Sequence, residues 1–169
     1  GVPVYMTRYD SMAGQTTYNR EERADIALSY NAKYLISCHN NAYFESSHGV
    51  EVIIPNSNGP NGTYHHNEGV GLANALLSNL TAMGIADRGY YTRDSIDDED
   101  GIVYYDDGSV ADYYGINYHA KLRGITGIII EHAFVTNEAD YWGFLSTEDK
   151  LAALGRADAQ AIASYLGLK

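Results

Sequence analysis

Two apolar runs in this chain stop abruptly at polar residues, and this pattern limits the folds that the chain can adopt. Residues 127–130 (Gly-Ile-Ile-Ile) are followed by Glu131, and residues 34–37 (Tyr-Leu-Ile-Ser) are followed by the tripeptide 38–40 (Cys-His-Asn). Runs as apolar as 127–130 are typical of strands that are buried on both faces of a parallel sheet. Polar groups at the carboxyl ends of such strands converge on one edge, where ligands bind. We therefore expect a functional site at that edge.

Helical patterns alternate with the strand-like runs, and this alternation predicts an α/β fold. The length of 169 residues fits a single domain with its own core. We expect a twisted, mostly parallel or mixed sheet of about five to six strands, flanked by helices. The expected strands are residues 2–6, 34–37, 49–54, 88–93 and 125–130.

The helix boundaries have their own signals in the sequence. Asn19 and Glu22 form a capping-box pattern at the start of the first helix. Residues 56–67 are rich in Gly and Asn, so we expect a loop there, followed by a long helix. Ser146 or Thr147 opens the last helix.

Composition excludes several classes of partner. The chain has 22 acidic and 11 basic residues, a formal net charge of -11. Binding to nucleic acid or to anionic lipid requires clustered Lys and Arg, so we expect neither, and the acidity favours solubility. No run is long and apolar enough for a membrane span, and we expect no signal peptide within residues 1–169. We expect a monomer, processed or trimmed before Gly1, without an internal disulfide because Cys38 is the single cysteine.

Glu131 is the strongest candidate for chemistry. Three isoleucines precede it, so its carboxylate is delivered into apolar, partly desolvated surroundings. Burial raises the pKa of a carboxyl group, which suits a general base that takes and returns a proton near neutral pH. The structural alternative is a carboxylate paired with Arg123 or His132, or one that caps Thr136 and Asn137.

His39 is the strongest candidate metal ligand, because neutral imidazole binds zinc and a strand end holds it rigidly. A satisfied structural histidine is the alternative. Asn41 can orient a ligand or substrate, or serve a turn. Arg8 can hold an acidic partner or a substrate carboxylate, or form a structural ion pair. His65 and His66 are expected to be exposed in the 56–67 loop.

An ordered series of short motifs extends along nearly the whole chain. The motifs are GVPVYMTR at 1–8, Arg-x-x-x-Ala at 23–27, ISCHNNA at 36–42, GVEV at 49–52, IEHAF at 130–134 and Thr-Asn at 136–137. In this order they resemble the zinc-dependent N-acetylmuramoyl-L-alanine amidases of the type 3 amidase family. Residues 107–116 further resemble members from clostridia-like Gram-positive bacteria.

The resemblance implies an amidase/phosphorylase-like fold and hydrolysis of the amide between N-acetylmuramic acid and L-alanine in peptidoglycan. It implies a secreted autolysin that acts in the cell wall of a Gram-positive-type bacterium. Family members hold Zn²⁺ with two histidines and a glutamate, and His39 matches the second of these histidines. Glu131 matches the family's catalytic glutamate. Zinc would activate water and polarise the carbonyl group, and Glu131 would transfer the proton.

The chain departs from the family pattern at its amino-terminal end. The family's first zinc histidine, its glutamate ligand and its first strand and helix lie before the position that matches Gly1. We therefore expect residues 1–169 to be a single, amino-terminally incomplete amidase-like domain. Leu28 stands where the family usually has asparagine.

Three functional classes remain open at the level of sequence. The first is a zinc amidase. The second is a non-catalytic peptidoglycan-binding module, favoured by the missing ligands and by the 16 tyrosines, which can stack on sugars. The third is an unrelated α/β hydrolase or peptidase that uses Cys38 or Ser37, although no nucleophile-elbow pattern accompanies either residue.

Overall fold

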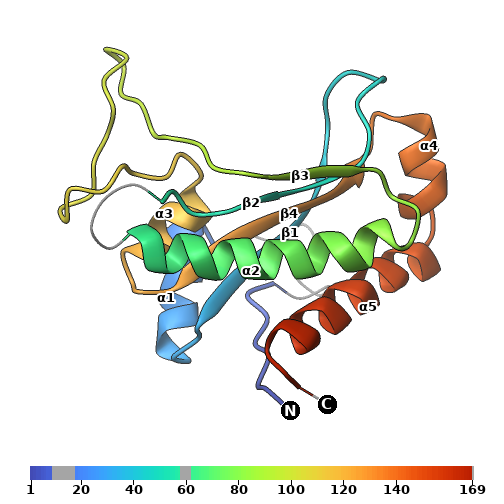
Figure 1. Ribbon diagram of the computed structural model, residues 1–169, viewed down its shortest axis with the longest axis horizontal. Helices are drawn as coiled ribbons and strands as arrows, with labels where there is room; N and C mark the ends of the chain where they lie inside the picture. Colours follow the sequence, from blue (N-terminus) through green and yellow to red (C-terminus); the bar gives the residue numbers. More distant parts are fainter. Residues whose placement is uncertain (9–17, 58–61, 169) are drawn as a thin grey trace.

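A four-stranded mixed sheet forms the centre of the molecule (Figure 1). The computed structural model describes residues 1–8, 18–57 and 62–168. The strands lie in the order β1-β4-β2-β3. Strands β1 and β4 are parallel, β2 and β3 are parallel, and β2 and β4 are antiparallel. Their bounds are Tyr34–Asn41 for β1, Val50–Ile53 for β2, Asp87–Tyr91 for β3 and Thr126–Phe134 for β4.

Helices cover both faces of the sheet, in agreement with the expected α/β fold. One face carries α2 (Gly62–Thr81) and α5 (Glu148–Tyr165), and the other carries α1 (Arg20–Ser29) and α3 (Gly115–Lys121). After β4, the short helix α4 (Glu138–Asp140) continues into a π-helical turn at Tyr141–Leu145.

The alternation of side chains along β4 separates two apolar cores. Ile128 and Ile130 pack with residues of α2 and α5, whereas Ile129 packs with residues of α1 and α3. All three isoleucines are buried, because β4 lies between two strands and between two helical layers. A strand that is apolar on both faces is what the sequence predicts for this segment.

The number of strands is lower than expected. Residues 2–6 belong to no strand of the described sheet; Val4 is 82% exposed, and Tyr5 stacks on Tyr30 with ring centroids 3.8 Å apart. This strand-like segment therefore has no pairing partner in the described sheet. A sheet edge must supply that partner before such a pattern becomes a strand.

Two predicted helix starts are confirmed, and one is wrong. Asn19 and Glu22 form the capping box of α1, and the Thr147 side chain caps α5. Helix α2 begins at Gly62, so His65 and His66 lie on its first turns and not in a loop. Both side chains are partly buried, whereas the sequence predicted exposed ones. Residues 58–61 of the expected loop lie outside the described residues. The imidazole Nδ1 of His65 lies 2.9 Å from Thr126 Oγ1, which ties this turn to the sheet.

The segment between β3 and α3 leaves the body of the protein as an acidic excursion (Figure 1). Isolated bridges such as Tyr104–Val110 hold its two arms together. Its base is fixed by buried Asp112, which accepts hydrogen bonds from the Asn56 amide and the Tyr105 hydroxyl. None of the helices in the described part of the chain combines the length and apolar character that a membrane span requires.

Candidate active site

Three neighbouring strands place polar residues in one row across the sheet. His39 of β1 pairs in register with Glu131 of β4, and Glu131 pairs with Glu51 of β2. The adjacent row contains Ile129 and Ile53, which belong to the apolar core under α1 and α3. On this face of the sheet, the side chains therefore change from apolar to polar between one row and the next. The change occurs where β1 and β4 approach their carboxyl ends.

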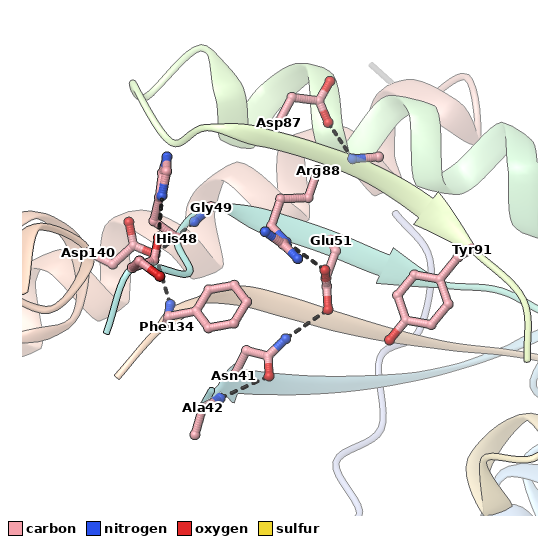
Figure 2. A network of polar contacts seen from close by, with 12 residues as sticks. Asn41, Ala42, His48, Gly49, Glu51, Asp87, Arg88, Tyr91, Phe134 and Asp140 are labelled. Carbon is pink, nitrogen blue, oxygen red and sulfur yellow. Dashed lines mark hydrogen bonds and ion pairs between the residues drawn. The ribbon is translucent and has the colours of Figure 1, made fainter. Parts of the chain in front are cut away.

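A network of polar contacts holds Glu51 from two sides. Its carboxylate accepts a 2.7 Å hydrogen bond from Asn41 Nδ2 and a 2.7 Å hydrogen bond from Arg88 Nε. The Arg88 guanidinium also lies 5.0 Å from the centre of the Phe134 ring. Figure 2 shows Asn41, Glu51 and Arg88 pointing toward one another above the strands. A cation and an amide therefore hold the Glu51 side chain in place from two sides.

A cleft of about 450 Å³ opens over the Glu51 and Glu131 part of this row, and His39 is not among its lining residues. Glu51 and Glu131 lie in it, and the tyrosines 43, 91 and 114 contribute to its walls. The hydroxyl groups of Tyr91 and Tyr114 lie 3.2 Å apart. A concave site with aromatic walls and a few convergent polar groups is typical of ligand binding.

The electrostatics of Glu131 differ from those of Glu51. Burial, and then the negative charge of Glu51, raise the pKa of the Glu131 carboxyl to about 7. Its Oε2 atom is buried and has no hydrogen-bond partner in the described part of the protein. A carboxyl group that lines a cleft and has a pKa near neutrality can accept and return a proton.

Two of the structural alternatives for Glu131, an ion pair with Arg123 or with His132, are not seen among the described residues. Arg123 is paired with Glu21 and Asp25 instead. His132 points to the opposite face of the sheet and contacts Asp158. Alternation along a strand explains this outcome, because successive side chains of β4 point to opposite faces.

His39 is exposed on the edge strand β1, and its Nε2 lies 2.8 Å from Ser37 Oγ. Burial of the ring, followed by the positive charge of Arg23, lowers the pKa of the His39 imidazole below its usual value. The neutral form is the one that binds metals. Asn41 orients Glu51 and also accepts from the Ala42 amide, so it serves both the site and the turn.

Arg8 is not among the residues that line the cleft. It is exposed on the segment before α1, and no hydrogen bond or ion pair joins it to His39, Asn41 or Glu131 within the described residues. The arginine that reaches the cleft is Arg88, which sequence reasoning missed together with the role of Glu51. The available signal was a single carboxylate within the apolar run at 50–54.

The arrangement on the opposite face argues against a cysteine nucleophile. The His132 ring nitrogens contact the His39 carbonyl oxygen at 3.0 Å and Asp158 Oδ2 at 2.8 Å. Both nitrogens are therefore engaged, and neither is free to activate Cys38. Burial, and then the charge of Asp158, raise the pKa of the Cys38 thiol to about 11, whereas a nucleophilic cysteine needs a lowered one.

The described residues do not by themselves complete a zinc site. A zinc site usually needs three protein ligands. In the described ranges, no group of three or more His, Cys, Asp or Glu side chains lies close enough to hold a metal ion. His39 is the one expected ligand that the structure brings to the polar row.

The fold and the polar row together define an α/β domain with a carboxylate-bearing cleft at the end of its central strands. The family model for N-acetylmuramoyl-L-alanine amidase matches residues 1–164. The chain therefore belongs to this amidase family. No curated protein sequence matches the chain significantly.

Several solved structures have a similar fold, and amidases are among them by their descriptions. Cwp6 from Clostridium difficile aligns with a TM-score of 0.74 at 22% identity, over 98% of this chain and 22% of its own. Ami1 from Mycobacterium smegmatis, an N-acetylmuramyl-L-alanine amidase, aligns with a TM-score of 0.65 at 18% identity, over 96% of this chain and 66% of its own. The catalytic domain of CwlV from Bacillus (Paenibacillus) polymyxa aligns with a TM-score of 0.60 at 18% identity, over 92% and 69%. The chain thus spans about a fifth of Cwp6 and about two thirds of the other two. At these identities the likeness concerns the fold.

Proposed function

We propose that this protein hydrolyses the amide bond between N-acetylmuramic acid and L-alanine in peptidoglycan, with Glu131 as general base and then general acid. Glu131 lines the cleft with a half-buried carboxyl group, one oxygen of which has no hydrogen-bond partner among the described residues, and this is the observation that supports the role. Family membership supports the choice of substrate. Action on this substrate places the protein in the cell wall, outside the cell, and we propose a Gram-positive-type host.

The chemistry requires one proton to move twice. The ionised Glu131 takes a proton from the water that attacks the amide carbonyl carbon. It then gives that proton to the leaving nitrogen of L-alanine as the C–N bond breaks. Glu51 favours the return step, because its negative charge raises the proton affinity of Glu131. Asn41 and Arg88 hold Glu51 in the position that this effect needs.

The family resemblance further implies zinc, with His39 as a ligand. Because His39 is the one ligand that the described residues bring to the row, residues 1–169 alone should bind well under one zinc per chain. Inductively coupled plasma mass spectrometry of the purified, zinc-equilibrated chain measures this ratio. A stoichiometric zinc that resists dialysis and is lost in His39→Ala would contradict this expectation.

The incomplete metal site among the described residues also favours a second candidate function. A domain without a complete metal site can bind peptidoglycan without cleaving it. Release of dye from labelled peptidoglycan, together with new amino groups on L-alanine, separates the two functions. Release that a chelator abolishes and zinc restores supports the zinc amidase; chelator-insensitive release contradicts the zinc part. Pull-down with peptidoglycan but no release supports the binding module.

The pH dependence of activity should follow Glu131. A general base works only when ionised, so kcat/KM should rise about tenfold per pH unit below about pH 7 and level off above it. Replacing Glu51 by Gln removes the negative charge that raises the pKa of Glu131, and should move this midpoint to lower pH. Initial rates on a soluble muramoyl peptide between pH 5 and 9 measure both profiles. An unchanged midpoint in Glu51→Gln would show that the two carboxylates are not coupled.

A further inference from the structure

The face of the sheet behind the polar row carries a buried pair, His132 and Asp158, that the proposed chemistry does not use. His132 is 5% exposed and Asp158 is 7% exposed. His132 belongs to β4 and follows Glu131 directly, and Asp158 belongs to α5. The His132 Nε2 atom lies 2.8 Å from Asp158 Oδ2, so the pair joins the helix to the sheet.

The other nitrogen of His132 contacts the neighbouring strand at a specific point. Its Nδ1 lies 3.0 Å from the backbone carbonyl oxygen of His39. A carbonyl oxygen can only accept, so Nδ1 carries a proton and donates it to His39. The imidazole therefore bridges a carboxylate of α5 and the backbone of β1.

The contact falls where the strand pairing is irregular. His39 pairs with Glu131, but Asn41 pairs with Phe134, so β4 contains one residue more than β1 in this stretch. Beyond the irregularity, the Val135 amide donates to the Asn41 carbonyl at 2.8 Å. Irregularities of this kind redirect side chains and are frequent beside active sites. The extra residue of β4 lies between two register pairs, His39–Glu131 and Asn41–Phe134. It therefore affects the directions in which the side chains of His39 and Asn41 point relative to Glu131.

We propose that His132, anchored by Asp158, is a positioning residue that fixes this irregularity through the His39 carbonyl and so aligns His39 and Asn41 with Glu131. The inference rests on the proposed amidase function. It assigns a role in catalysis to a residue on the face opposite the cleft.

Two substitutions at His132 separate its two contacts. His132→Asn places an amide nitrogen near the position of Nδ1, so it keeps the donor to His39 and loses Asp158. His132→Gln places its amide nitrogen near the position of Nε2, so it keeps Asp158 and loses His39. Asp112→Asn, at the other end of the sheet, is a control for the loss of a buried charge.

The two His132 variants should therefore differ in what they lose: His132→Gln mainly activity, and His132→Asn mainly stability. His132→Gln should lower kcat on a muramoyl peptide by roughly 10- to 100-fold at nearly unchanged KM, because reacting groups are misplaced. His132→Asn should keep kcat within about threefold of the wild type, although it melts at a lower temperature because Asp158 is left buried and unpaired. Hydrogen exchange of the Val135 amide should be faster in His132→Gln than in His132→Asn or Asp112→Asn.

Each outcome decides the proposal. Equal kcat in the two His132 variants, or equal exchange at Val135, would overturn the positioning role while leaving the amidase function intact. If the wild-type protein neither cleaves nor binds muramoyl peptides, the proposed function itself is wrong. The exchange measurement then still reports whether His132 fixes the irregularity in β4.

Discussion

Replacing Glu131 by Gln should lower the rate of peptidoglycan hydrolysis by roughly a hundred- to ten-thousand-fold, the usual contribution of a general acid–base group. Glutamine has nearly the same shape and keeps an oxygen in the cleft, but it cannot take a proton from water. Dye release from labelled peptidoglycan measures the effect. Glu138→Gln is the matched control, because Glu138 is an exposed carboxylate on the nearby helix α4.

The same variant allows a check that the protein is folded. The pKa of Glu131 is raised in the folded state from 4.5 to about 7, so protonated Glu131 favours the folded state. This contribution is complete below about pH 4.5 and is lost as the pH rises through about 7. Glu131→Gln should therefore melt at a higher temperature than the wild type at pH 8. Retained hydrolysis in a variant that melts in this way would remove Glu131 from the mechanism.

Replacing Asp140 by Ala should lower the free energy of unfolding by roughly 2–6 kcal/mol, since two buried backbone donors lose their acceptor at about 1–3 kcal/mol each. Asp140 Oδ2 accepts from the Gly49 amide at 2.8 Å and from the Phe134 amide at 2.9 Å (Figure 2). These bonds fasten the residue before β2 to the end of β4. They therefore also keep Glu51 opposite Glu131.

Urea unfolding followed by circular dichroism measures this loss. Asp140→Asn keeps an oxygen acceptor and should lose clearly less stability than Asp140→Ala. Equal losses in the two variants would show that the charge, and not the pair of accepted hydrogen bonds, stabilises this junction. Gly49 is unsuitable as a test of the same contact. Its φ is +104°, and a Cβ atom would lie 2.4 Å from the Ala86 carbonyl oxygen.

Much of the fold could be predicted because its signals are local. The capping box of α1, the cap of α5 and the apolar strand that ends at Glu131 each depend on residues close in sequence. The proximity of His39 and Glu131 followed from one rule, that parallel strands end at the same edge. The register partners of β1 and β4 agree with that rule.

Other features depend on pairings that no local pattern contains. Residues 2–6 resemble a strand in sequence, but no sheet edge pairs with them among the described residues. Glu51 and Arg88 meet because β3 lies beside β2, and their sequence separation gives no indication of that. Arg88 lines the cleft, whereas Arg8, the sequence candidate for substrate binding, is not among its lining residues.

The sequence by itself determined the class of fold, its family and the two strand ends that carry His39 and Glu131. These follow from short-range periodicity and from the order of the motifs along the chain. Only the tertiary structure decided that Glu51 lies opposite Glu131 and raises its pKa, and that His132 joins β1 to α5 from behind. The physical reason is that charge coupling and buried hydrogen bonds depend on distances between strands, which strand order and register determine.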